Sequence, residues 1–167
     1  MLHTFTKFWC RIQQVSPSRD RIKTMEDYQS AFLERYKDTQ TLCNSSRKVA
    51  AMHFGGVTTE CLLKSMILAK LPKGTSREWK TDSNNPGHTI TNPGHSLQNA
   101  LRRHNVLNSR VQNFPQVIKW LNIVESPKQH FIDMRYSGIE PTDPDYKQWL
   151  SAYSKLTDWL LKQSTTL

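Results

Sequence analysis

The stretch from Arg47 to Lys70 constrains the fold of this chain most, because it is apolar on nearly every side. A helix of that kind is buried within a bundle rather than half-exposed on a surface. Gly55 and Gly56 lie near its middle, where each costs about 1 kcal/mol relative to alanine. We therefore expect the two glycines either to allow another helix to approach closely or to make room for a ligand.

Three polar side chains also fall on one side of this predicted helix. Glu60 follows His53 by seven residues, and Lys64 follows Glu60 by four. Side chains at these spacings lie on the same face of a helix. A buried carboxylate, ammonium and imidazole must either form hydrogen bonds or ion pairs with one another or serve a function such as ligand binding. Two interpretations stay open, namely an ordinary ion pair and the centre of a small basic pocket.

The rest of the chain predicts an all-α, up-and-down bundle of about four to five helices. Helical spacing or capping residues mark about 25–43, 47–70, 95–104, 113–124 and 143–161. No stretch shows a strand pattern of comparable quality. We assign residues 25–167 to one helical domain. Residues 1–24 are interpreted as an N-terminal extension or linker. Alternatively, they are an over-called start, and Met25 is the natural initiator.

Composition narrows the expected partners and compartment. A net charge of +9 and a pI near 9.6 favour an anionic partner such as nucleic acid or nucleotide, although a merely basic surface is an equal alternative. Cys10, Cys43 and Cys61 lack metal-type spacing and are typical of reduced thiols in a cytoplasmic protein. We expect no metal, no cofactor, no membrane span and no secretory signal.

Three ordered stretches together resemble the HEPN domain family, a group of small helical bundles. They are Ala50–Lys64, with its glycines and Glu-Cys-Leu-Leu-Lys; Gly94–Leu97, which reads Gly-His-Ser-Leu; and Met134–Ser137, which reads Met-Arg-Tyr-Ser. The resemblance covers about residues 25–163. It implies one of two branches: metal-independent ribonucleases, usually toxins of toxin–antitoxin systems or defence effectors, or non-nuclease members that accompany a minimal nucleotidyltransferase. It also implies a homodimer.

The spacing of arginine and histidine bears on which branch applies. Active nucleases of this family carry Arg, four to six residues and then His in the later half of the domain, and no such pair occurs there in this chain. Arg47 and His53 have the spacing, but they lie at the start of the glycine-bearing helix. A six-residue step also turns a helix by about 240°. Arg47, His53 and His95 are therefore only candidates for catalysis, and the sequence favours a non-enzymatic role.

The first hypothesis is a non-catalytic HEPN-like module that binds a nucleotide or a minimal nucleotidyltransferase. Glu60, Lys64, His95 and Arg135 would converge on a polar pocket, and Tyr136 would stack on or hydrogen-bond to the ligand. The second hypothesis is a ribonuclease toxin that uses His53 or His95 for proton transfer. The third is a basic nucleic-acid-binding protein whose affinity comes from dispersed lysines and arginines.

Overall fold

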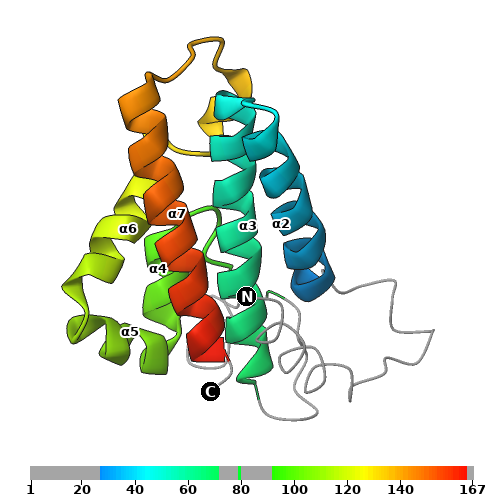
Figure 1. Ribbon diagram of the computed structural model, residues 1–167. Helices are drawn as coiled ribbons and strands as arrows, with labels where there is room; N and C mark the ends of the chain where they lie inside the picture. The colour runs from blue at the N-terminus through cyan, green and yellow to red at the C-terminus, as the bar shows by residue number, and fades with distance from the viewer. Residues whose placement is uncertain (1–26, 72–78, 80–91, 165–167) are drawn as a thin grey trace, which may run out of the picture.

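The computed structural model describes residues 27–71, 79 and 92–164, whose regular elements are all helices, with no strand among them (Figure 1). The all-α prediction is confirmed. The extension assigned to residues 1–24 lies outside the described residues. The elements are α2 (Tyr28–Asn44), α3 (Lys48–Ala69), α4 (Leu97–Arg103), α5 (Asn105–Gln112), α6 (Pro115–Glu125), the 3-10 helix η3 (Asp133–Tyr136) and α7 (Asp143–Ser164).

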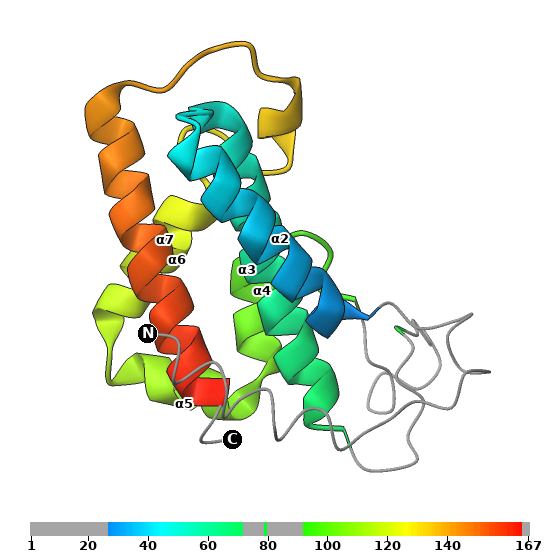
Figure 2. The ribbon, with the colours of Figure 1, turned by 45° about the vertical axis from the view of Figure 1, so that its right-hand side comes forward.

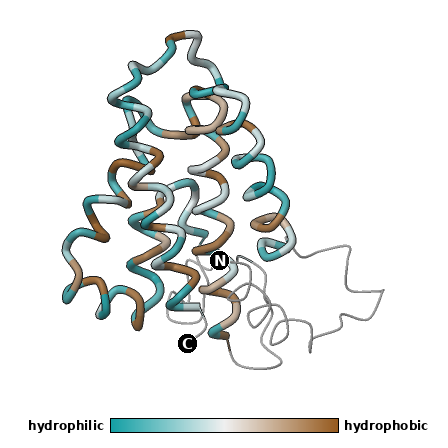
Figure 3. Tube along the Cα trace, in the orientation of Figure 1, coloured by the Kyte–Doolittle hydropathy of each residue, from teal (hydrophilic) through white to brown (hydrophobic). Residues whose placement is uncertain are grey.

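Helix α3 is the central element of the bundle. It contacts α2, α4, α6, α7 and η3; it lies between α7 and α2 in Figure 1, and α2 crosses in front of it in Figure 2. Most of its residues are buried, from Ala51 near its start to Leu68 near its end. Its trace is mainly white to brown, whereas the outer helix α2 is mostly teal (Figure 3). Burial of α3 on all sides follows from its apolar composition, as the sequence predicts.

The two glycines of α3 serve close packing. A Cβ at Gly55 would overlap the ring of Trp149, which is stacked on Tyr153 within α7 with ring centroids 5.2 Å apart. A Cβ at Gly56 would overlap the fully buried ring of Phe131. Aromatic rings therefore occupy the space on both sides. Close approach of the last helix, α7, is confirmed at Gly55, whereas the neighbour of Gly56 is the ring of Phe131, which lies between α6 and η3.

One helix and one short turn of helix lie where the sequence predicts none. Helix α5 begins directly after α4, because His104 ends α4 with φ −96° and ψ 89° and its Nδ1 accepts a hydrogen bond from the backbone N–H of Leu107 at 3.2 Å. With α5, the described residues contain six α-helices instead of four to five. The segment before α7, predicted to be irregular, contains η3.

Length and apolarity together decide whether a helix can cross a bilayer. None of the helices in the described part of the chain combines the two to the degree that a membrane span requires.

Candidate functional site

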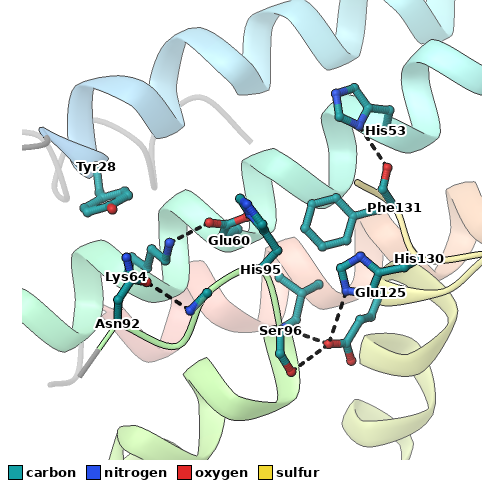
Figure 4. A network of polar contacts seen from close by, with 12 residues as sticks. Tyr28, His53, Glu60, Lys64, Asn92, His95, Ser96, Glu125, His130 and Phe131 are labelled. Atoms are coloured by element: carbon teal, nitrogen blue, oxygen red, sulfur yellow. Dashed lines mark hydrogen bonds and ion pairs between the residues drawn. The ribbon is translucent and has the colours of Figure 1, made fainter. Parts of the chain in front are cut away.

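Glu60, Lys64 and His95 form one polar cluster, in which the carboxylate and the ammonium are buried (Figure 4). Lys64 Nζ donates to Glu60 Oε1 at 2.6 Å, and His95 Nδ1 donates to Glu60 Oε2 at 2.9 Å. The side chains of Glu60 and Lys64 are 8% and 4% exposed, whereas that of His95 is 58% exposed. Both oxygens of the carboxylate are therefore occupied by cationic or polar donors from the protein itself.

Two aromatic rings complete the surroundings of Lys64. Its Nζ lies 5.1 Å from the ring centroid of Tyr28 and 5.9 Å from that of Trp79, which places the ammonium within cation–π range of both. Trp79 Nε1 donates to the hydroxyl of Tyr28 at 3.0 Å, so the two rings hold each other. An ammonium that is paired, enclosed and 4% exposed contributes to the fold and offers a ligand no access.

A second buried carboxylate, Glu125, fixes the segment that carries His95. Its Oε1 accepts from Ser96 Oγ at 3.0 Å and from the backbone N–H of Leu97 at 2.9 Å, which supports the start of α4. Gly94, with φ +64°, makes the preceding turn in a conformation that favours glycine. Sequence reasoning did not single out Glu125, because a lone glutamate at the end of a helix is usually exposed.

His53 lies apart from this cluster although it shares α3 with it. Seven residues span about 10 Å along a helix, and the imidazole of His53 is directed toward the segment before η3 (Figure 4). Its Nδ1 lies 2.9 Å from the carbonyl oxygen of Phe131. A carbonyl can only accept a hydrogen bond, so Nδ1 carries the proton. In the neutral imidazole, Nε2 is then left as an acceptor.

A cleft of about 480 Å³ lies between the first turns of α3 and the segment 134–140. It brings together Arg47, His53 and Arg135, three residues that the sequence analysis named for different reasons. The remaining lining residues are Val49, Ala50, Phe54, Met134, Ser137, Gly138 and Glu140.

Arg135 belongs to this cleft rather than to the cluster at Glu60. Its guanidinium lies 4.7 Å from the ring centroid of Tyr136, the neighbouring side chain, which is 79% exposed. Among the described residues Glu60 pairs with Lys64 and His95 and not with Arg135. The single pocket expected from the sequence is thus divided in two, because η3 lies against the first half of α3 and Glu60 lies in the second half.

The first residues of α3 itself carry positive charge only. Arg47 is the N-cap residue, Lys48 follows it, and the first turn holds no acidic residue. Lys48 Nζ lies 2.6 Å from Asp143 Oδ1. Its hydrogen bond to Asp143 raises the pKa of Lys48, and the charges of Asp143 and Glu140 raise it further, so Glu140 lies near this end of α3. The positive end of the helix dipole adds to the attraction for an anion.

The cleft therefore presents two guanidinium groups and an imidazole to an anion, with the carboxylate of Glu140 also in its lining. Two guanidinium groups can each bind a phosphate through two parallel hydrogen bonds. A protonated His53 would donate Nε2–H in addition, and a neutral one could accept a proton there. Sequence reasoning named Arg47, His53 and Arg135 but not Glu140, since no pattern marks a lone glutamate in an irregular segment.

Comparison with models of protein families, with curated proteins and with solved structures finds no match to this chain.

Proposed function

We propose that this chain is a HEPN-like, non-catalytic module of the cytoplasm that binds a nucleotide through the cleft between α3 and segment 134–140. The observation that carries the proposal is the meeting of Arg47, His53 and Arg135 in one open cleft. These residues come from two segments that lie more than eighty positions apart in the sequence. Two guanidinium groups and an imidazole together commonly bind a phosphate group.

The dimensions and surroundings of the cleft support a nucleotide rather than a bare anion. A volume of about 480 Å³ lies within the range of small-molecule sites. Tyr136 is exposed beside Arg135 and offers an aromatic face to a base. The enclosed cluster at Glu60 and Lys64 then stabilises the bundle that carries the site.

Ligand-dependent stabilisation tests this proposal. A nucleoside monophosphate at one hundred times its Kd should raise the free energy of unfolding by about 2.7 kcal/mol, seen as a higher Tm. Arg135→Gln should reduce the stabilisation by about half or more at the same ligand concentration, whereas Arg103→Gln should keep it, because Arg103 is exposed at the end of α4 away from the cleft lining. No shift with any nucleotide contradicts the proposal.

A second candidate function, metal-independent cleavage of RNA, is favoured by the hydrogen bond between His53 and Phe131. It holds the neutral imidazole with Nε2 as a proton acceptor inside a cleft that also holds Arg47 and Arg135. This combination suits general acid–base catalysis with guanidinium stabilisation of a phosphorane. His53→Gln should then abolish cleavage and retain RNA binding. Intact RNA after incubation with the wild-type protein in the presence of a chelator contradicts this candidate.

The partners implied by the resemblance belong to the same proposal. A minimal nucleotidyltransferase and a second copy of the chain are the expected protein partners, and light scattering of the purified protein alone and with such an enzyme tests both.

The third hypothesis, nucleic-acid binding through dispersed charge, is distinguished by the salt dependence of the affinity. Binding through many lysines and arginines would weaken steeply with ionic strength and would not respond to Arg135→Gln alone.

A further inference from the structure

His104, between α4 and α5, is a buried histidine with one ring nitrogen that lacks a hydrogen-bond partner. The residue is 3% exposed, and its Nδ1 accepts from the backbone N–H of Leu107 at 3.2 Å. Because Nδ1 is the acceptor, Nε2 carries the proton in the neutral ring. Nε2 is buried and finds no acceptor in the described part of the chain. A buried donor of this kind costs about 1–3 kcal/mol unless a partner satisfies it.

Two cations lie close to this imidazole. Burial is the main cause that lowers the pKa of His104, and the charges of Lys70 and Arg110 lower it further, so both charges are near the ring. Lys70 is the exposed C-cap residue of α3. Arg110 lies in the last turn of α5, and its Nη1 donates to Oε1 of Gln163 in α7 at 2.7 Å. Residues from α3, α5 and the link between α4 and α5 therefore gather around one unsatisfied N–H group.

This group of residues lies at the end of the bundle opposite to the cleft. The cleft is lined by the first turns of α3, whereas Lys70 follows its last turn. The end of α3, helix α5 and the end of α7 all lie at the lower end of the bundle in both ribbon views (Figures 1 and 2). Within residues 27–71, 79 and 92–164, Lys70 takes part in no ion pair. An acceptor that satisfies Nε2–H beside two positive charges is best supplied by an anion.

We propose that this end of the bundle binds a small oxyanion of the phosphate or sulfate class, which accepts hydrogen bonds from His104 Nε2, Lys70 and Arg110. Such an ion has several acceptor oxygens, so it can serve all three donors at once, and charged donors make the stronger bonds. Its negative charge also offsets the repulsion between the two cations. Because Nε2 is shielded from solvent, admission of the ion requires a side-chain movement, which the exposed Lys70 can make. The site is separate from the cleft and does not depend on the function proposed for it.

The ring signal of His104 tests this site. Sulfate, titrated at constant ionic strength maintained with sodium chloride, should shift the Nε2 resonance of His104 saturably in long-range ¹H–¹⁵N correlation spectra. His104→Asn assigns the signal by its loss. Lys70→Gln should weaken the apparent affinity by about tenfold or more, because a hydrogen bond to a charged group is lost. Lys119→Gln, which removes an exposed lysine of α6, should keep the wild-type affinity.

Inorganic phosphate and methyl phosphate, titrated in the same way, distinguish two sources of the anion. Equal affinities assign a phosphate group carried by a larger ligand, and binding of inorganic phosphate alone assigns the free ion. A His104 signal that none of these anions moves overturns the site, and so does an unchanged affinity in Lys70→Gln. Arg135→Gln, which alters the cleft, should leave the titration unchanged, and loss of the His104 shift in that variant also overturns the proposal. Because Lys70 is exposed, Lys70→Gln should melt near the wild-type Tm.

Discussion

Phe131 contacts α3 twice, through its ring at Gly56 and through its carbonyl oxygen, which accepts a hydrogen bond from His53 Nδ1 at 2.9 Å. The ring is fully buried, so its position is fixed by packing. The backbone of Phe131, and with it the orientation of the imidazole in the cleft, follows from that packing. The core of the bundle and the candidate site are therefore linked through one residue.

Gly56→Ala should destabilise the protein by about 1–3 kcal/mol, because the added methyl group overlaps the ring of Phe131. Helix propensity alone would favour alanine by about 1 kcal/mol. The sign of the change in the free energy of unfolding therefore distinguishes the effect of packing from that of helix propensity. Gly138→Ala, where a Cβ meets no atom within 4 Å, should leave the urea midpoint near that of the wild type. Equal or greater stability of Gly56→Ala would show that the ring moves aside at no cost.

The fold was predictable from periodicity, and the exceptions have local causes. The apolar stripes of the long helices predict which of their faces are buried. The four-residue step from Glu60 to Lys64 predicts the contact between these two side chains. Helix α5 was not predicted, because the break depends on the imidazole of His104 capping Leu107, a use of histidine that spacing does not reveal. The sequence predicts that His95 meets Glu60 and Lys64, but it does not predict that Arg135 lies against the first half of α3, because tertiary packing places η3 there.

Breaking the buried pair at Glu60 and Lys64 should be costly. Lys64→Met leaves the carboxylate of Glu60 buried with the imidazole of His95 as its remaining hydrogen-bond partner, and Glu60→Gln leaves the ammonium uncompensated. Each change should cost about 3–5 kcal/mol in urea unfolding. The double variant Glu60→Gln/Lys64→Met should recover part of that loss. Lys37→Met, which breaks an exposed pair with Glu34, should change stability little. Single variants with wild-type stability would contradict a closed, structural cluster.

Acid should weaken the fold through His104. Burial lowers the pKa of this imidazole below its usual 6.5, while in the unfolded chain it titrates normally. As the pH falls, the unfolded state therefore binds the proton before the folded state does. The contribution of His104 to the free energy of unfolding is complete above pH 6.5 and declines as the pH falls toward the lowered pKa. His104→Asn keeps a capping acceptor but does not titrate. The free energy of unfolding, measured across this pH range, should fall less in the variant than in the wild type, and identical curves would contradict the prediction.

Tyr136 should contribute to the binding affinity for nucleotides and not to that for inorganic phosphate. Its ring is exposed beside the guanidinium of Arg135 and is available to stack on a base. Tyr136→Ala should weaken nucleotide binding by about 1–3 kcal/mol and leave phosphate binding unchanged. Equal losses for both ligands would indicate that the ring acts by holding Arg135 in place.

The most direct test of the cleft as a nucleotide site is calorimetric titration of a nucleoside monophosphate into the wild type, Arg47→Gln, Arg135→Gln and the control Arg103→Gln. Each cleft variant should lose about tenfold or more in affinity, because a hydrogen bond to a charged group is worth about 1.5–3 kcal/mol. The control should bind as the wild type does. Unchanged affinity in both cleft variants, or no binding by the wild type, would contradict the assignment of this cleft.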